Sequence, residues 1–183
     1  MADTPLLLTT DVPPDTAWAA FDPEWYVQAY PEARGIDPSE VLSFYLERGR
    51  TLGHSPNPYF DEAWYLATYP EVELALQTGE AASGFEEYCQ SGWRTRSPHW
   101  LFDDAIYAAL YPDLSAETLA NAGFRNRYDH FLRVGSKEGR IGHLFFDPAV
   151  YEGRLRPDAP GSPFGRFLRG LAFGEPERRT TLY

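Results

Sequence analysis

The sequence predicts an all-α protein that is an array of about four helix-turn-helix repeats of roughly 39–44 residues. A motif beginning Phe-Asp occurs four times, and its phenylalanines (Phe21, Phe60, Phe102 and Phe146) are 39, 42 and 44 residues apart. Such a period is typical of helical repeats. Hydrophobic residues make up 43% of the chain and aromatic residues 16%, a composition that excludes a largely disordered protein.

The first helix of each repeat is predicted from the residues at its start. The aspartate of the motif is suited to the N-cap position, where a carboxylate accepts a backbone N–H. The phenylalanine before it and a tyrosine five residues later have the spacing of a hydrophobic staple. These elements are Phe21, Asp22 and Tyr26; Phe60, Asp61 and Tyr65; Phe102, Asp103 and Tyr107; and Phe146, Asp147 and Tyr151. The proline of the following Tyr-Pro pair, or of Arg156-Pro157 in the fourth repeat, ends the helix after about two turns.

A second helix follows in each repeat. Asp37-Pro38 opens residues 39–49, Ser83 and Glu86 have capping-box spacing, Asn126 caps residues 127–135 after an extra turn from Ser115, and Ser162-Pro163 opens residues 164–170. Gly49, Gly92 and Gly135 stand where a left-handed residue would end a helix.

These elements give an N-terminal tail, residues 1–17, and a repeat domain, residues 18–183. The units, here called copies 1 to 4, cover about residues 21–59, 60–101, 102–145 and 146–183. The last residues, Thr-Thr-Leu-Tyr, stand where a further Phe-Asp is due. We therefore expect the array to be truncated before a further unit, and to self-associate through an open C-terminal edge.

The net charge, the apolar segments and the cysteine count limit the possible functions and the expected location. The formal net charge of −11 argues against nucleic-acid binding, which needs a basic face. The chain has no signal-peptide pattern and no apolar run long enough for a membrane span, so a cytoplasmic location is expected. Cys89 is the only cysteine, which excludes an internal disulfide, and its alignment with Leu46, Leu132 and Leu168 predicts a core position.

No active site is visible in the sequence, and no cofactor or metal site is predicted. The four motif aspartates are explained as helix caps, and His99 and His143 occupy equivalent places in the repeat. Neither histidine nor cysteine has the spacing of a zinc site, and no glycine-rich phosphate loop occurs. Whether the chain is part of an enzyme is uncertain from these residues.

The candidate binding residues are aromatic and basic. Trp18, Tyr59, Trp93 and Trp100 lie outside the staple pairs, and Arg50, Arg94, Arg96 and Arg140 recur in basic turns. Exposed aromatic rings can stack on a sugar or anchor a protein, and arginines can bind anionic groups. The alternative readings are that the aromatic rings fill grooves between repeats and that the arginines complement helix ends.

The repeat pattern, best seen in residues 55–72, 97–114 and 128–151, resembles the tandem segments beside catalytic domains in bacterial glycosyltransferases of surface polysaccharide synthesis. The resemblance covers residues 18–183. It implies a non-catalytic scaffold or a glycan- or partner-binding region of a glycosyltransferase, whose transferase domain would lie outside this chain. The alternative is a free-standing carbohydrate- or protein-interaction module without a transferase domain.

Overall fold

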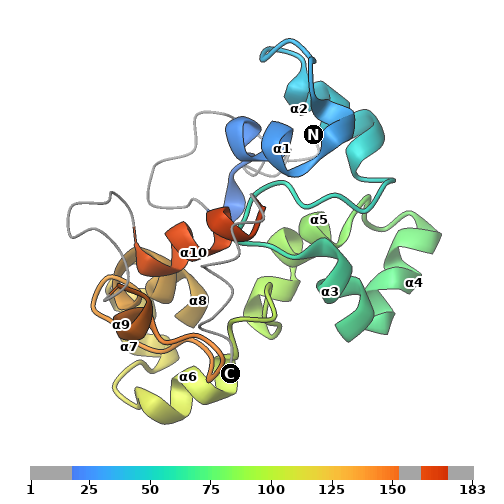
Figure 1. Ribbon diagram of the computed structural model, residues 1–183. Helices are drawn as coiled ribbons and strands as arrows, with labels where there is room; N and C mark the ends of the chain where they lie inside the picture. Colours follow the sequence, from blue (N-terminus) through green and yellow to red (C-terminus); the bar gives the residue numbers. More distant parts are fainter. Residues whose placement is uncertain (1–17, 153–161, 173–183) are drawn as a thin grey trace. The chain divides into compact units, whose positions relative to one another are not determined.

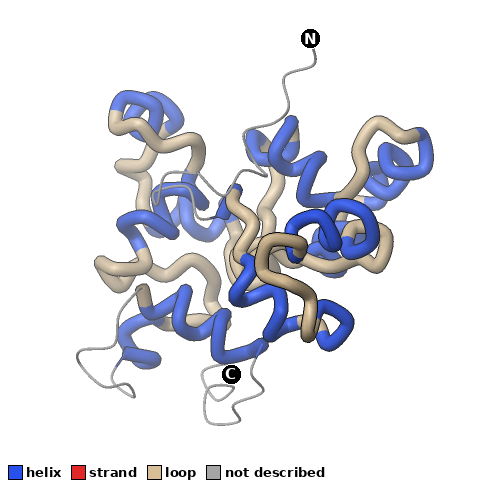
Figure 2. The backbone as a smooth tube through the Cα atoms, turned by 90° about the horizontal axis from the view of Figure 1, so that it is seen from above, coloured by secondary structure: helices blue, strands red, loops and turns tan. Residues whose placement is uncertain are grey.

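The chain was analysed as a computed structural model, which describes residues 18–152 and 162–172. Within these ranges the chain is helical and contains no strand (Figure 2), apart from a single antiparallel bridge between His143 and Phe146. The prediction of an all-α fold is confirmed. The predicted tail and the proposed open C-terminal edge lie outside the described residues.

The chain divides into two compact units, Met1–Trp100 and Leu101–Tyr183, which are described separately. The first contains copies 1 and 2. Its elements (Figure 1) are α1 (Pro23–Ala29), η3 (Pro31–Ala33), α2 (Val41–Phe44), η4 (Tyr45–Gly49), α3 (Glu62–Thr68), α4 (Pro70–Thr78), α5 (Gly84–Gln90) and η5 (Gly92–Arg94). Helices α3, α4 and α5 all contact one another.

The second unit contains copies 3 and 4. Its elements are α6 (Asp104–Leu110), α7 (Ala116–Asn121), α8 (Arg127–His130), η6 (Phe131–Gly135), α9 (Pro148–Glu152) and α10 (Pro163–Ala172). Helices α6 and α8 contact each other, as do α9 and α10.

The predicted N-caps are present at the start of the first helix in every copy. The Asp22, Asp61 and Asp103 carboxylates each accept the backbone N–H three residues later, at 2.9–3.0 Å. Asp147 accepts the corresponding N–H of Val150 at 3.3 Å. The capped helices α1, α3 and α6 are each seven residues long, which agrees with the predicted two turns. The second-helix caps Ser83, Ser115, Asn126 and Ser162 likewise accept the backbone N–H three residues later.

Each copy builds its core from three mutually contacting rings, here called the aromatic triad. The staple phenylalanine and tyrosine have ring centroids 5.0–5.7 Å apart. Both also contact an aromatic ring of the second helical segment, at 4.9–5.8 Å. That third ring belongs to Tyr45, Tyr88, Phe131 and Phe167 in copies 1 to 4. All twelve rings are at most 5% exposed, so the triads are the centre of hydrophobic stabilisation.

The prediction of left-handed helix ends at Gly49, Gly92 and Gly135 is wrong, because none of these glycines has a positive φ. Glycine is required at these positions because there is no room for a Cβ atom. A Cβ at any of them would overlap the hydroxyl oxygen of the staple tyrosine in the same copy. In copies 1 and 3 a left-handed glycine, Gly53 or Gly139, follows four residues after this position.

The second helix of copy 1 also begins later than predicted. Its first helical residue is Val41, while the Asp37 carboxylate accepts the backbone N–H and the hydroxyl of Ser39 in a turn before the helix. This helix and its counterpart in copy 3 then widen into the π-helical segments η4 and η6, which the sequence did not predict. Both segments end at the glycine beside the staple tyrosine.

Copies 1 to 3 each close on themselves through the tyrosine of the Tyr-Pro pair. The hydroxyl oxygens of Tyr30, Tyr69 and Tyr111 accept the backbone N–H of a residue in the returning loop at 2.7–3.0 Å. The residue that precedes this N–H in the chain lies against the same ring: His54 stacks on Tyr30 with centroids 3.8 Å apart, Arg96 lies 5.5 Å from Tyr69, and Arg140 lies 4.8 Å from Tyr111. We call this arrangement the tyrosine clamp.

Candidate functional site

Trp18, one of the four aromatic candidates for binding, is buried. Trp18 is only 2% exposed, and its ring meets Tyr88 edge-on with centroids 5.6 Å apart. Because Tyr88 belongs to the triad of copy 2, Trp18 joins the segment before copy 1 to the next core. Its alternative reading, as a groove filler, is the one that the structure supports.

The other three aromatic candidates are half-buried; Trp93 lies in η5, and Tyr59 and Trp100 lie in separate loops. Trp93 contacts Arg94, one of the candidate binding arginines: the guanidinium carbon of Arg94 lies 4.5 Å from the centroid of the Trp93 ring. Trp100 stacks beside His99 with centroids 5.9 Å apart. Tyr59 follows Asn57, whose side-chain oxygen accepts the Tyr59 backbone N–H.

Three of the four candidate arginines are held in ion pairs of their own unit. Arg50 binds Glu86 at 3.2 Å, Arg96 binds Glu71 at 3.1 Å and Glu87 at 2.5 Å, and Arg140 binds Glu138 at 2.8 Å with Asp113 at 3.8 Å. Arg96 and Arg140 are also parts of tyrosine clamps. Only Arg94 is exposed, and it donates to the Gln90 carbonyl oxygen at 3.1 Å.

The histidines are part of the scaffold as well. The Nδ1 atoms of His54 and His130 lie 2.7 and 3.0 Å from the hydroxyl oxygens of Tyr26 and Tyr107. Burial lowers the pKa of His99 to about 3, so its ring is neutral at ordinary pH. Among the described residues, no group of three or more histidine, cysteine or carboxylate side chains is arranged to hold a metal ion. Cys89, 6% exposed, occupies the predicted core position.

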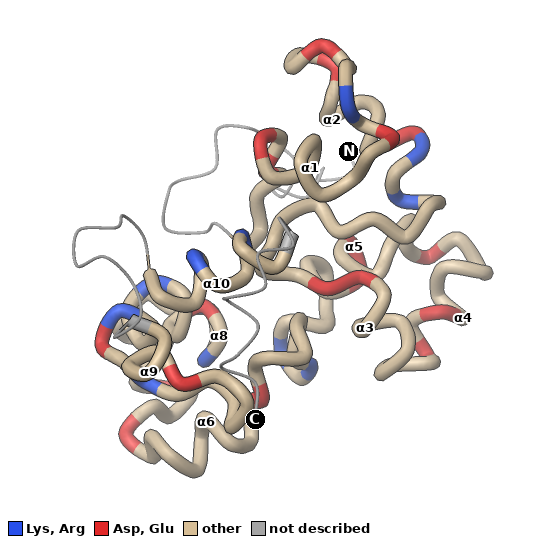
Figure 3. The backbone as a smooth tube through the Cα atoms, in the orientation of Figure 1, with Lys and Arg blue, Asp and Glu red and all other residues tan. Residues whose placement is uncertain are grey.

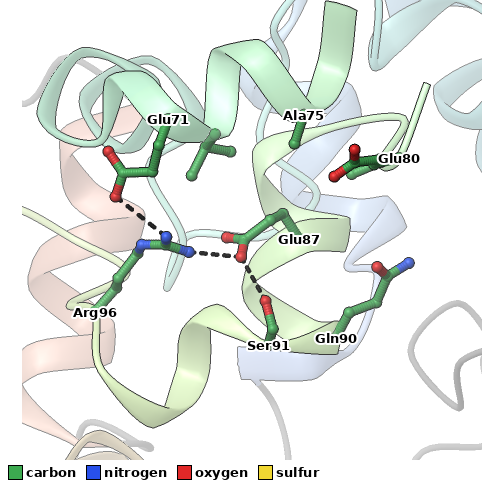
Figure 4. A pocket seen from close by; sticks show the side chains of 9 residues that line it. Glu71, Ala75, Glu80, Glu87, Gln90, Ser91 and Arg96 are labelled. Atoms are coloured by element: carbon green, nitrogen blue, oxygen red, sulfur yellow. Dashed lines mark hydrogen bonds and ion pairs between the residues drawn. The ribbon is translucent and has the colours of Figure 1, made fainter. Parts of the chain in front are cut away.

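Copy 2 carries a polar cavity of about 260 Å³, here called the acidic pocket, formed by α4, α5 and the segments after them (Figure 4). Its floor is apolar and comprises Val72, Ala75 and Ala81. Its polar lining consists of Glu71, Glu80, Glu87, Gln90, Ser91 and Arg96. Sequence reasoning selected only Arg96 from this set.

The pocket depends on the helix that follows the Tyr-Pro pair in copy 2, which is longer than the corresponding segment of copy 1. In copy 1, Pro31 begins only the three-residue turn η3, whereas Pro70 begins the nine-residue helix α4. Its first turn places Glu71 opposite Arg96, and its end brings Glu80 near Gln90 (Figure 4). The length of α4 was the signal that sequence reasoning missed, since the proline was read only as a stop.

One wall of the acidic pocket is a fixed ionic network. The Glu87 carboxylate accepts from Arg96, from the Ser91 hydroxyl at 2.6 Å and from the staple hydroxyl of Tyr65 at 2.7 Å. Burial and then the bond to Glu87 raise the pKa of Tyr65 above its ordinary value, so the phenol stays protonated and keeps donating. The core of copy 2 is thus bonded directly to the pocket wall.

A second buried carboxylate, that of Glu62, holds the start of α5 in place. Glu62 is 1% exposed, and its two oxygens accept the backbone N–H groups of Gly84 and Phe85 at 2.6 and 2.9 Å. These are the first residues of α5, so Glu62 fixes the start of the helix that carries Glu87, Gln90 and Ser91. Burial raises the pKa of Glu62 to about 7 despite these hydrogen bonds.

No helix in the described parts of the chain has both the length and the apolar character needed to cross a bilayer. No family model matches the chain, and no curated protein or solved structure shows significant similarity to it.

Proposed function

We propose that this chain is a non-catalytic helical repeat region that binds a glycan through the acidic pocket, in a protein of bacterial polysaccharide synthesis that also carries a glycosyltransferase domain. The observation that supports the binding role is that most of the residues that line the pocket differ from those that form the repeat. Most recurring residues cap helices, build aromatic triads or close copies. In the pocket, Glu71 and Arg96 recur as Asp113 and Arg140, whereas Glu80, Glu87, Gln90 and Ser91 do not recur in the other copies.

The chemistry of the pocket favours a hydroxylated ligand. Carboxylate, amide and hydroxyl groups surround a small apolar floor, as is common where a few polar groups fix the orientation of a ligand. Sugar hydroxyls can both donate and accept, which suits this mixture. The link to a glycosyltransferase rests on the resemblance of the repeat pattern, which no residue of the pocket tests.

A glycan array probed with the whole chain tests the binding role. We expect retention on a subset of glycans, and loss of that retention when Gln90 and Ser91 are both replaced by alanine, since their side chains line the pocket. A matched control replaces Gln77 and Thr78, polar residues of α4 outside the pocket lining, by alanine. Equal retention of both variants, or no retention of the wild type, would contradict the proposal.

The transferase association has a separate test. The intact mass of the natural protein in its own cell should exceed the 20.8 kDa of this chain. The additional sequence should then encode a nucleotide-sugar-binding domain. A natural mass of 20.8 kDa would refute this association and leave a free-standing binding module.

One observation favours the alternative of a protein-interaction module. Leu144 and Phe145 are adjacent in the loop before copy 4 and are 65% and 48% exposed. Exposed apolar pairs of this kind are used in protein contacts. If they mediate contact between two molecules of this protein, sedimentation will show concentration-dependent association. Replacement of both residues by serine should remove that association. A monomer at all concentrations would remove support for this contact.

A further inference from the structure

The acidic pocket has the charge and hydrogen-bonding character of a site for a positively charged ligand. Its three carboxylates and one guanidinium give a formal charge of −2 at neutral pH. Figure 3 shows acidic positions along α4, the helix that forms one side of the pocket. An anionic sugar would therefore be repelled, contrary to what the basic turns of the sequence suggested.

Arg96 cannot offset this repulsion, because its cationic group is already used. Its Nη1 binds Glu87, its Nη2 binds Glu71, and its guanidinium lies over the ring of Tyr69. An incoming carboxylate or phosphate would have to displace Glu87 or Glu71 from the guanidinium. Breaking such pairs is unfavourable unless new bonds of equal strength form.

Most of the open groups of the pocket are hydrogen-bond acceptors. Within the described residues, the Glu80 carboxylate has no hydrogen-bond or ion-pair partner, and Figure 4 shows it on the same side of the pocket as Gln90. The Gln90 amide nitrogen donates one of its two hydrogens to Glu86 at 3.1 Å, which leaves its second N–H and its carbonyl oxygen open. The Glu71 side chain is 59% exposed and binds Arg96 through one oxygen. A matching ligand must supply several donors.

Cavity size limits the ligand further. A volume of about 260 Å³ lies below the range typical for drug-sized ligands. It is suited to one sugar residue rather than to an oligosaccharide.

We propose that the acidic pocket binds a single sugar residue that carries a free amino group, with its ammonium beside Glu80 and its hydroxyls directed to Gln90, Glu71 and Ser91. This assignment rests on the proposed glycan-binding function and names the substrate class of the same site. A free ammonium supplies three donors and a positive charge, whereas an N-acetylated amine loses the charge. Because no aromatic ring lines the pocket, affinity for one residue is expected in the millimolar range, about −4 kcal/mol.

The test is a titration of the whole, isotopically labelled chain with glucosamine, followed through backbone amide resonances. We expect the largest shifts at Glu80, Gln90 and Ser91. Glucose and N-acetylglucosamine should bind at least about threefold more weakly, and glucuronic acid should not bind, as expected for one exposed ion pair. Glu80→Gln should weaken glucosamine binding about three- to fivefold and leave glucose unchanged.

The matched control is Glu73→Gln, which removes a carboxylate of α4 that lies outside the pocket lining. It should change glucosamine binding far less than Glu80→Gln. Equal losses from the two variants would overturn the assignment, because general attraction by the acidic surface would then explain the binding. Equally strong binding of ethanolamine would also overturn it, since an ammonium alone would suffice.

Two further outcomes separate this inference from the proposed function. If neutral sugars shift the pocket resonances while glucosamine does not bind more tightly, the amino-sugar assignment fails and the glycan-binding role stands. If no sugar shifts any resonance and the glycan array is also blank, both fail.

Discussion

Replacement of Gly135 by alanine tests the structural role that the recurring glycines have in this fold. Gly135 ends the π-helical segment η6 and has no positive φ, so helix propensity alone predicts that alanine stabilises the protein by up to about 1 kcal/mol. The structure predicts the opposite sign. A Cβ at this position would overlap the Tyr107 hydroxyl, while the next nearest atom, Cζ of the same ring, lies at an ordinary 3.4 Å.

The size of the effect follows from how firmly Tyr107 is held. Its ring is fully buried, with neighbouring ring centroids at 5.4 Å (Phe102), 4.8 Å (Tyr111) and 5.6 Å (Phe131). Overpacking of such a core costs about 1–3 kcal/mol, and loss of the hydroxyl bond to His130 adds about 1 kcal/mol. After subtraction of the propensity gain, we expect Gly135→Ala to destabilise the protein by about 2 kcal/mol.

The assay is a double-mutant cycle with Tyr107→Phe, measured by urea unfolding and far-ultraviolet circular dichroism. Removal of the hydroxyl removes the overlap, so in the Tyr107→Phe background the alanine should be neutral or stabilising by up to about 1 kcal/mol. Gly139→Ala is the matched control. Gly139 has a φ of 74° and open space around it, so alanine there costs about 1–2 kcal/mol of backbone strain in either background.

Two results would refute this reasoning. A wild-type-like or increased stability of Gly135→Ala would show that the hydroxyl does not occupy the space beside the glycine. A destabilisation that persists unchanged in the Tyr107→Phe background would show that the cause lies elsewhere in η6.

Three further predictions concern the caps, the clamp and the buried carboxylate. Asp103→Ala should lower the free energy of unfolding by about 1 kcal/mol through loss of the N-cap of α6, measured by thermal unfolding; an unchanged midpoint would contradict it. Tyr111→Phe should accelerate hydrogen exchange at the Ile141 amide, whose clamp acceptor it removes, and unaltered protection there would refute the clamp. Because burial raises the folded-state pKa of Glu62 to about 7, above an unfolded value near 4.5, its stabilising contribution is present below pH 4.5 and is lost as pH rises to 7. The stability difference between wild type and Glu62→Gln should therefore shift by about 3 kcal/mol in favour of the variant across this window in chemical denaturation, and a pH-independent difference would disprove the assignment.

Features set by short stretches of chain were predictable. The N-caps depend on residues three apart and the staples on residues five apart, and both were found in the structure where the sequence placed them. The helix starts at Ser83, Ser115 and Asn126 were found for the same reason.

Features that join distant parts of the chain were not predictable in the same way. The role of Gly135 depends on a hydroxyl group 28 residues earlier, and a glycine near a helix end gives the same local signal for a left-handed turn. The tyrosine clamp spans similar separations, so the recurring arginines were read as binding residues although two of them stack on tyrosines. The acidic pocket was missed because it depends on a helix that only copy 2 extends.

The self-closure of the copies also bears on how such a gene can change in length. The aspartate that begins each of copies 1 to 3 donates its backbone N–H to a carbonyl near the end of the same copy, and the tyrosine clamp is likewise internal. A duplicated or deleted segment of this size therefore carries both partners of every closing bond. Recombination at the copy boundaries leaves these bonds intact, so a duplicate is free to acquire its own loop residues and, with them, a new specificity.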